Sequence, residues 1–448
     1  MAAIKVGARA RVRWAMAAVA VTALALSVHA CSRDSLLEVE TPDIIDPDAL
    51  NNAQGVSALY AGAISEFVFQ MDNGTPGGAP LSVFSALFTD EAMHASTPPA
   101  VREWDLRNVP ASNTISPVIF LNLQRARARS EDAAQRITKL VTGADARIGE
   151  LWAVSAFTYV LFGELYCSGV PISSSEPLTY GAPLSTTQLL DTALARLTTA
   201  SGAAAGDARI VNLIAVLRGR ALLGQGQFAQ AGLAVAAVPT SYVYQIFHST
   251  TTPRQTNQIP VQFGADIYSV PSGEGTNGLN FSTAADPRVP TLATGLSRND
   301  GATVMVQFTK YTTQADPVTQ ASGIEARLIE AEAALNLSTP DPVLFLSKLN
   351  EARATMAGLS TLTDPGTPAA RVDLLFRERA FWFYLTAHRL GDLRRMVRQY
   401  ARSAESVFPT GAYHKQGLTR GTQVSFIVPQ PEENNPSYTA AACDATKP

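Results

Sequence analysis

The most constraining feature of this 448-residue chain is an apolar helical pattern in residues 371–399, RVDLLFRERAFWFYLTAHRLGDLRRMVRQ. Apolar side chains recur there at steps of four, three, four and three, which is the spacing of one face of an α-helix. They are Phe376, Ala380, Phe383, Ala387 and Leu390. The run FWFYL adds apolar side chains on the other faces, so the pattern predicts a central helix covered on nearly all sides.

Charged residues stand at both ends of this predicted helix. The triplet RER, residues 377–379, precedes its most apolar turns, and HRLGDLRR, residues 388–395, follows them. Because a buried charge is costly unless it is paired, these side chains need partners elsewhere in the protein. Further along, an apolar, strand-like segment ends in PQPEENNPSY, residues 429–438.

This order of segments resembles the C-terminal signature of the SusD/RagB-type outer-membrane nutrient-binding lipoproteins. Many members of that family have a glutamate–glycine pair just before the His-Arg pair, and here Thr386 and Ala387 stand in those positions. The resemblance covers nearly the whole chain after residue 30, with its specific motifs concentrated in residues 371–436. The signature contains no catalytic motif, so we interpret its charges as structural.

Two pairs of helical patterns indicate a structural repeat. Residues 208–223 and 227–238 form the first pair, and residues 323–337 and 343–356 form the second. In the first pair, small residues and one aromatic resemble tetratricopeptide-repeat positions. These are Ala221, Gly226, Phe228 and Ala231. We therefore predict a predominantly all-α fold of tetratricopeptide-like helix pairs, stacked as a solenoid, with long loop-rich insertions that contain short strands.

The segment that interrupts the repeats has a different character. Residues 239–322 contain seven prolines and few helical periods, and an unstructured loop of that length inside a compact domain is implausible. We therefore predict an ordered insertion with short strands. The expected organisation is a signal peptide in residues 1–30 and one SusD/RagB-like domain in residues 31–448. The domain divides into helical repeats at about 48–238 and 323–400, a loop-rich ligand-side insertion at about 239–322 and an irregular C-terminal wrap at 401–448.

The first 30 residues predict export from the cytoplasm. Four basic residues precede an apolar run of 15, Trp14–Val28, which is shorter than the ~20 residues of a membrane-spanning helix. We expect no later segment to be apolar over the length that a membrane-spanning helix needs. The mature chain is therefore expected to be soluble or lipid-anchored. Loss of the four basic residues changes the formal net charge from −3 to −7, and an acidic surface argues against nucleic acid as the partner.

Cys31 follows Val28-His29-Ala30, a sequence that fits two kinds of cleavage site. It resembles a lipobox, whose cysteine is acylated, and Val-x-Ala also suits ordinary signal peptidase. Members of the resembled family are usually anchored at such a cysteine, so the resemblance implies lipidation of Cys31. The other reading, a soluble periplasmic protein with an incidental Cys31, stays open.

The two remaining cysteines, Cys167 and Cys443, are candidates for a disulfide. In an oxidising envelope compartment, two leftover thiols are typically bridged. Closing so long a loop would stabilise the fold by ~4–5 kcal/mol in the chain-entropy model. The alternative is a buried Cys167 at the end of an apolar helix and a loose Cys443. Neither has a histidine or cysteine at ligand spacing, so we expect no metal site there.

The sequence contains no enzyme motif such as HExxH, GxSxG or GxxxxGKS/T. Asp90 and Glu91 are adjacent, but neighbours on a helix point about 100° apart, so we interpret the pair as structural. Asp105 and Glu274 are single carboxylates with nothing nearby in sequence to pair them as the acid and base of a glycosidase. The sequence leaves their pairing in space open. We expect no catalytic residue, no cofactor and no metal.

Glycan binding would require aromatic platforms, because a sugar ring stacks its C–H face on a flat side chain. Six aromatic residues in loop-like or insertion segments are the candidates. They are Trp104, Tyr180, Tyr242, Tyr244, Tyr268 and Tyr311. The alternative for each is a half-buried ring that fills a loop.

The resemblance implies a surface-facing outer-membrane lipoprotein that caps a SusC-like TonB-dependent barrel. It would bind an oligomeric nutrient, most often a glycan, and deliver it to that barrel without chemistry. An alternative from another class is a periplasmic helical-repeat scaffold that binds proteins, and a third hypothesis is a glycoside hydrolase. Loop aromatics do not encode which ligand such a scaffold takes, so the sequence leaves the ligand unidentified.

Overall fold

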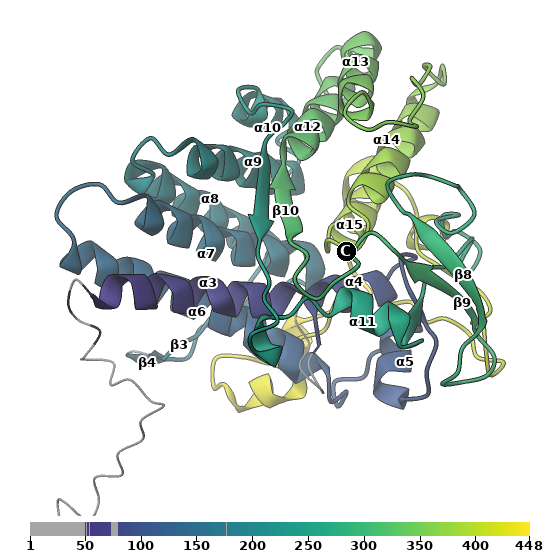
Figure 1. The fold of residues 1–448 in the computed structure, drawn as a ribbon, viewed down its shortest axis with the longest axis horizontal. Helices are drawn as coiled ribbons and strands as arrows, with labels where there is room; N and C mark the ends of the chain where they lie inside the picture. Colours follow the sequence, from purple (N-terminus) through teal and green to yellow (C-terminus); the bar gives the residue numbers. More distant parts are fainter. Residues whose placement is uncertain (1–49, 51, 53, 73–78, 176) are drawn as a thin grey trace, which may run out of the picture. The chain divides into compact units, whose positions relative to one another are not determined.

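The computed structural model describes residues 50, 52, 54–72, 79–175 and 177–448. The predicted signal peptide and Cys31 lie outside the described residues. The chain divides into two units, residues 1–51 and 52–448. The elements below all belong to the second unit, and Figure 1 shows their arrangement.

Helices form most of the regular structure of this unit, so the predicted predominantly helical fold is confirmed. The α-helices are α3 (Gly55–Asp72), α4 (Leu81–Leu87), α5 (Pro99–Asp105), α6 (Ser116–Leu140), α7 (Ala146–Leu165), α8 (Thr186–Ala203), α9 (Ala208–Gly224), α10 (Phe228–Val235), α11 (Ile259–Gly264), α12 (Gly323–Leu335), α13 (Pro342–Arg353), α14 (Pro368–Trp382), α15 (Arg389–Tyr400) and α16 (Ala404–Val407). Short 3₁₀ helices occupy Pro253–Gln255, Gln430–Asn434 and Ala440–Ala442.

Side-chain caps fix where several helices begin. Ser185 and Gln188 form a reciprocal capping box at the start of α8. At the start of α13, Asp341 accepts hydrogen bonds from the amides of Val343 and Leu344. Such caps satisfy backbone N–H groups that have no partner inside the helix, and each stabilises it by about 1 kcal/mol.

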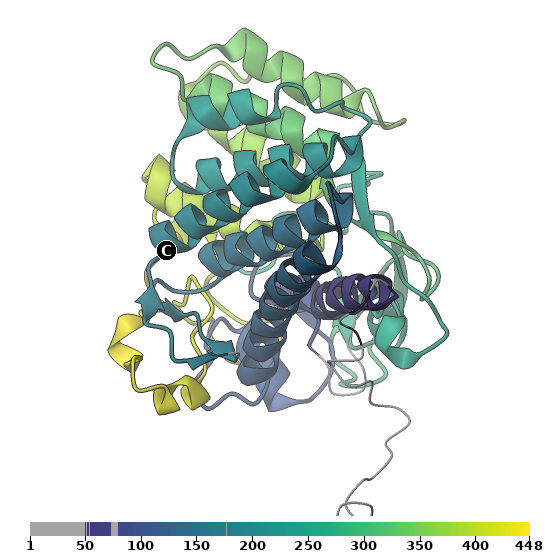
Figure 2. The ribbon, with the colours of Figure 1, turned by 90° about the vertical axis from the view of Figure 1, so that its left-hand side faces the viewer.

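The helices form a stack in which each packs against the next. Helix α6 packs on α7, α7 on α8, α9 on α10 and α12 on α13, and Figure 2 shows them one above another. Contacts between α10 and α12 join the two predicted helix pairs across the intervening insertion. Small residues permit this packing: a Cβ on Gly219 would lie 2.6 Å from the Val235 side chain. The tetratricopeptide-like pairing is thus built on close helix contact.

One described helix, α7, is long and apolar enough to cross a membrane by length and composition. This corrects the expectation that no segment after the predicted signal peptide is apolar over the length of a membrane-spanning helix. In the structure, 89% of its apolar window is buried inside the protein. Helix α7 packs against α6, α8 and α9, so its apolar character serves the core of this helical stack.

The described strands are short and pair in twos. The antiparallel pairs are β1 (Met93–His94) with β7 (Tyr268–Ser269), β2 (Val170–Pro171) with β5 (Pro183–Leu184), β3 (Ser174–Ser175) with β4 (Leu178–Thr179), β6 (Val243–Ile246) with β10 (Val318–Ser322), and β8 (Thr291–Leu296) with β9 (Val304–Phe308). Strands β6 to β10 and helix α11 all lie within residues 239–322. Figure 1 shows β8 and β9 on the opposite side from α8.

The predicted central helix over residues 371–399 is wrong in one respect, because it is two helices. Helix α14 ends at Trp382 and α15 begins at Arg389. Between them, Leu385 and Ala387 have φ values of 59° and 61°, which are left-handed and incompatible with a continuing α-helix. The break lets the Leu385 amide donate a hydrogen bond of 3.3 Å to the buried Glu91 carboxylate. This tertiary contact outweighs the helical periodicity of the sequence.

The charges that flank the break do find partners, as the sequence required. Arg379 Nε lies 2.8 Å from Asp392 Oδ2, and Arg389 Nε lies 2.7 Å from Asp90 Oδ1. These pairs belong to a set of buried ion pairs, here called the central ion-pair network. Its members are Asp90, Glu164, Arg220, Arg288, Glu332, Arg353, Glu378, Arg379, Arg389, Asp392 and Arg395. The network ties α14 to α13 and to the 239–322 insertion, α15 to α12, and α7 to α9 through structural charges.

Candidate functional site

A pocket of about 400 Å³ lies where the 239–322 insertion meets the C-terminal wrap. Its lining combines the loop after β7 with residues of the wrap and Met93 of β1. The lining residues are Met93, Ser272, Gly273, Glu274, Gly275, Thr276, Thr410, Ala412, His414 and Arg420. Most of these side chains are polar, so the pocket offers hydrogen-bonding groups to a ligand.

Glycines in the loop after β7 make this pocket possible. Gly273 and Gly275 have φ values of 65° and 59°, which favour glycine. A Cβ on Gly275 would lie 2.6 Å from the Thr410 carbonyl oxygen, so a larger residue would push the loop away from the wrap. Hydrogen bonds then join the two segments: the Thr276 amide donates to Thr410 O at 3.1 Å, and Asn277 Nδ2 donates to Phe408 O at 3.0 Å.

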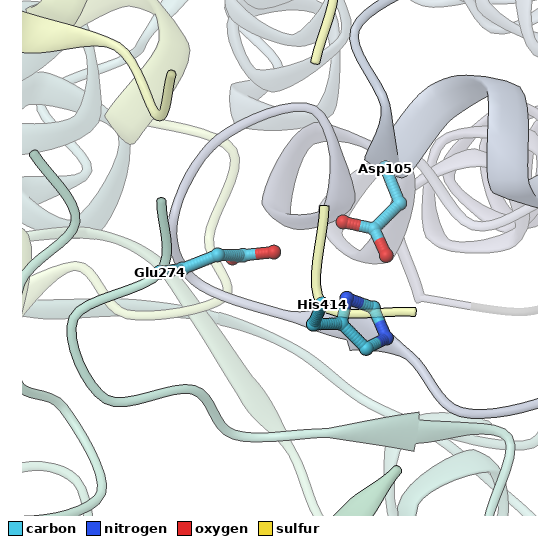
Figure 3. Close-up of side chains that lie close together, drawn as sticks. All are labelled: Asp105, Glu274 and His414. Atoms are coloured by element: carbon cyan, nitrogen blue, oxygen red, sulfur yellow. The ribbon is translucent and has the colours of Figure 1, made fainter. Parts of the chain in front are cut away.

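Three chemically functional side chains converge beside the pocket, as Figure 3 shows: Asp105, Glu274 and His414. One carboxylate or imidazole atom from each lies within 4.8 Å of those of the other two. Asp105 is the last residue of α5, Glu274 lies in the loop after β7, and His414 lies in the wrap. The sequence left open whether Asp105 and Glu274 pair in space, and the fold brings them together.

Arg420 and two further groups hold the carboxylates in place. The Arg420 guanidinium forms an ion pair with Glu274 Oε1 and donates to the Asp105 backbone oxygen at 2.6 Å. Asp105 Oδ2 accepts hydrogen bonds from the Tyr413 hydroxyl and the His94 amide, both at 2.7 Å. The cluster is therefore anchored from β1, α5, the insertion and the wrap at once.

Burial sets the protonation of this cluster. Burial raises the pKa of Glu274 well above its ordinary value, and although the Arg420 charge lowers it, the neighbouring Asp105 raises it further. Burial also lowers the pKa of His94 to about 4, with the Lys415 charge acting in the same direction. Desolvation likewise lowers the pKa of His414. At neutral pH both histidines are therefore neutral.

Four of the six predicted platform aromatics are buried, which corrects that prediction for them. Trp104 is only 1% exposed and packs against Phe84, Phe88 and Phe426, while its indole N–H donates to Asn113 Oδ1 at 3.2 Å. The buried rings also include Tyr244, Tyr268 and Tyr311. The end of α5 and the strands β6 and β7 turn Trp104, Tyr244 and Tyr268 into the core, and Tyr311, between β9 and β10, packs against Phe308.

The other two predicted aromatics, Tyr180 and Tyr242, remain accessible. Tyr180 is 52% exposed, whereas Tyr242 is half-buried and its hydroxyl donates to the Arg209 carbonyl oxygen at 2.8 Å. Neither is among the described residues that line the pocket. Sequence reasoning missed Phe247, which is 74% exposed. Its position three residues after the inward-facing Tyr244 places it on the opposite face of the extended chain, so strand alternation was the available signal.

The predicted pair of cysteines forms a disulfide in the structure. Cys167 and Cys443 have Cα atoms 5.3 Å apart and are separated by 276 residues in sequence. The Cys167 amide also donates to the Phe426 carbonyl oxygen at 2.9 Å. The end of α7 is thereby joined to the C-terminal wrap that carries His414.

The chain matches no family model and no curated protein. Solved structures match it over most of its length. Surface glycan-binding protein A from Bacteroides uniformis has a TM-score of 0.65 and 13% identity, covering 88% of this chain and 100% of its own. A SusD superfamily protein from Parabacteroides distasonis has a TM-score of 0.65 and 14% identity, covering 86% of this chain and 98% of its own. The fold is SusD-like.

A further SusD-like structure supports the same assignment. Surface glycan-binding protein A from Bacteroides thetaiotaomicron has a TM-score of 0.63 and 11% identity, covering 86% of this chain and 97% of its own. At such low identity the likeness establishes the fold, and the resemblance inferred from residues 371–438 is confirmed at that level. The SusD-like neighbours include proteins whose names state glycan binding.

Proposed function

We propose that this protein is a surface-facing outer-membrane lipoprotein that binds an oligomeric glycan and delivers it to a SusC-like TonB-dependent transporter. The observation that carries the proposal is the SusD-like fold, shared over nearly the full length of two proteins named as surface glycan-binding proteins. The predicted export signal and Cys31 supply the route to the membrane surface. Binding alone is the proposed activity.

The pocket beside the insertion is the proposed ligand site. Its volume of about 400 Å³ falls within the ~300–1,000 Å³ of typical small-ligand sites. Ser272, Thr276 and Thr410 present hydroxyl-bearing side chains at its surface, and His414 adds an exposed imidazole. Such groups donate and accept hydrogen bonds, as recognition of sugar hydroxyls requires.

A binding assay tests this placement. Full-length protein would be measured against a panel of polysaccharides by affinity electrophoresis and then calorimetry, beside the variants Ser272→Ala/Thr276→Val and Phe247→Ala. We expect the pocket variant to lose affinity at least tenfold and Phe247→Ala to retain it. The reverse pattern would move the ligand site to the exposed Phe247. Absence of binding to every polysaccharide would favour the periplasmic scaffold.

The partner and the anchor are tested together. Tagged protein would be isolated from detergent-solubilised native envelopes, with Cys31→Ala as the matched control, and the co-purifying proteins identified by mass spectrometry. We expect an acylated Cys31 and a stoichiometric TonB-dependent barrel with the wild type. An unmodified Cys31 without a barrel would favour the periplasmic scaffold.

Hydrolysis is not part of the proposal, because Asp105 and Glu274 are both buried. The acid and base of a glycosidase must flank the scissile bond of a bound sugar, and these carboxylates instead face each other beside Arg420. Incubation with the polysaccharides that bind should release no new reducing ends. Release of reducing ends that Glu274→Gln abolishes would establish an enzyme instead.

A further inference from the structure

We infer that Asp105, Glu274 and His414 form a binding site for one divalent transition-metal ion, Zn²⁺ or Mn²⁺. This site goes beyond the proposed glycan binding and does not depend on it. The ligand atoms of the three side chains lie within 4.8 Å of one another. A Zn²⁺ ion bound at its usual distances holds its nitrogen and oxygen ligands about 3.4 Å apart. Side-chain adjustments of about 1 Å would therefore bring all three onto one ion.

Two buried carboxylate oxygens point to such an ion. Asp105 Oδ1 and Glu274 Oε2 accept no hydrogen bond within the part of the chain that the structure describes. The nearest cation, Arg420 NH1, lies 3.6 Å from Asp105 Oδ1, which is beyond hydrogen-bonding distance. Buried polar atoms are rarely left without a partner. A metal ion between the two oxygens would satisfy both.

Asp105 Oδ2 and His414 Nε2 are already hydrogen-bonded, as the non-coordinating atoms of metal ligands usually are. Asp105 Oδ2 accepts hydrogen bonds from the Tyr413 hydroxyl and the His94 amide. His414 Nε2 lies 3.1 Å from the His94 carbonyl oxygen, so Nε2 carries the hydrogen and Nδ1 carries the free lone pair. Metal-binding histidines commonly donate their second ring N–H to a backbone carbonyl in this manner. In Figure 3, one nitrogen of the His414 ring faces the two carboxylates.

The donor set selects the class of metal. One imidazole nitrogen with two carboxylate oxygens suits Zn²⁺ or Mn²⁺, whereas Ca²⁺ and Mg²⁺ prefer oxygen ligands throughout. Arg420 pairs with Glu274 Oε1, so its charge offsets one carboxylate, and the other carboxylate neutralises one of the two positive charges of the ion. Three protein ligands leave at least one coordination position open. Glu274 and His414 both line the pocket, so that position faces the pocket.

A metal titration tests the site without any saccharide. Full-length protein would be dialysed against EDTA, transferred to metal-free buffer and titrated with ZnCl₂ and separately with MnCl₂ by calorimetry, with bound metal counted by mass spectrometry. We expect one ion per chain. His414→Ala should weaken binding at least tenfold, and its melting temperature in EDTA measures separately the loss of the His414–His94 hydrogen bond. Glu274→Gln should weaken it similarly.

The control is His248→Ala, because His248 is a half-buried histidine whose Nδ1 bonds the Asp316 carbonyl oxygen away from the pocket. This variant should bind the metal as the wild type does. Binding of neither ion, or equal affinity in wild type and His414→Ala, would overturn the inference. Because no glycan is present, these outcomes are independent of the proposed function.

Discussion

The central ion-pair network and the Asp105–Glu274–His414 cluster both contain buried carboxylates, but they differ in how many of the carboxylate oxygens are paired with a donor. In the network, both carboxylate oxygens of Asp392 are paired. Arg379 Nε lies 2.8 Å from Oδ2, and Arg395 Nη2 lies 2.8 Å from Oδ1. In the cluster, Asp105 Oδ1 and Glu274 Oε2 have no hydrogen-bond donor among the described residues. Each oxygen of Asp392 is paired with an arginine, whereas one oxygen of each carboxylate in the cluster has no donor among the described residues.

The same contrast governs protonation. Burial opposes the ionisation of Asp392, but Arg379 and Arg395 outweigh it and hold its pKa well below the ordinary value. Burial and Asp105 together raise the pKa of Glu274, and the single Arg420 does not offset them. Buried charged groups that are fully paired within the protein stabilise the fold. Buried charged groups that lack part of their pairing are available to a ligand.

The largest expected effect is that of breaking the network. Asp392→Asn removes the charge that two arginines share. Arg395 keeps its pair with Glu332, whereas the buried Arg379 guanidinium loses its carboxylate partner, which costs about 3–5 kcal/mol. We expect the free energy of unfolding in urea at pH 7 to fall by that amount. A loss below about 1 kcal/mol would place Asp392 in the same class as a surface ion pair.

The second effect concerns the disulfide that holds the wrap carrying His414. Cys443→Ser should lower the free energy of unfolding by about 2–5 kcal/mol, because the wrap is no longer linked to α7 in the unfolded chain. Reducing agent should have the same effect on the wild type and none on the variant. If the variant also lost metal binding, the cluster would depend on the wrap being fastened.

A smaller, stabilising effect is expected at the break between α14 and α15. Ala387 has φ of 61°, and a left-handed conformation costs a residue with a Cβ about 1–2 kcal/mol. Ala387→Gly removes this cost, although glycine has more freedom in the unfolded chain. We expect a net gain of about 1 kcal/mol or less. Leu385→Gly, which also removes a fully buried side chain, should be destabilising and so serves as the contrast.

The effect that sharpens the comparison most is that of Glu274→Gln in EDTA. A raised folded pKa means that the folded state holds a proton which the unfolded state releases above about pH 4.3. Stability contributed by this group therefore falls as pH rises toward the folded pKa. The variant should match the wild type near pH 4 and become the more stable of the two by pH 8. Melting temperatures across that range test the sign, and the opposite trend would show an ionised Glu274.

Much of the fold could be predicted from local pattern. Helices α9, α10, α12 and α13 begin and end within a few residues of the predicted ranges, because their apolar periodicity agrees with their burial. The break after Trp382 could not be predicted from local pattern, because its cause is the contact between Leu385 and Glu91, which are far apart in sequence. The buried state of Tyr244 and Tyr268 was likewise decided by which strand face meets the core.

The sequence by itself determined the helical repeats, the need of the RER and HRLGDLRR charges for partners and the pairing of the two cysteines as a candidate disulfide. Only the tertiary structure decided which carboxylates meet. Asp105, Glu274 and His414 lie more than a hundred residues apart, and no local spacing encodes their approach. They converge because glycines let the loop after β7 lie against the wrap, and such non-local contact depends on the packing of the whole chain.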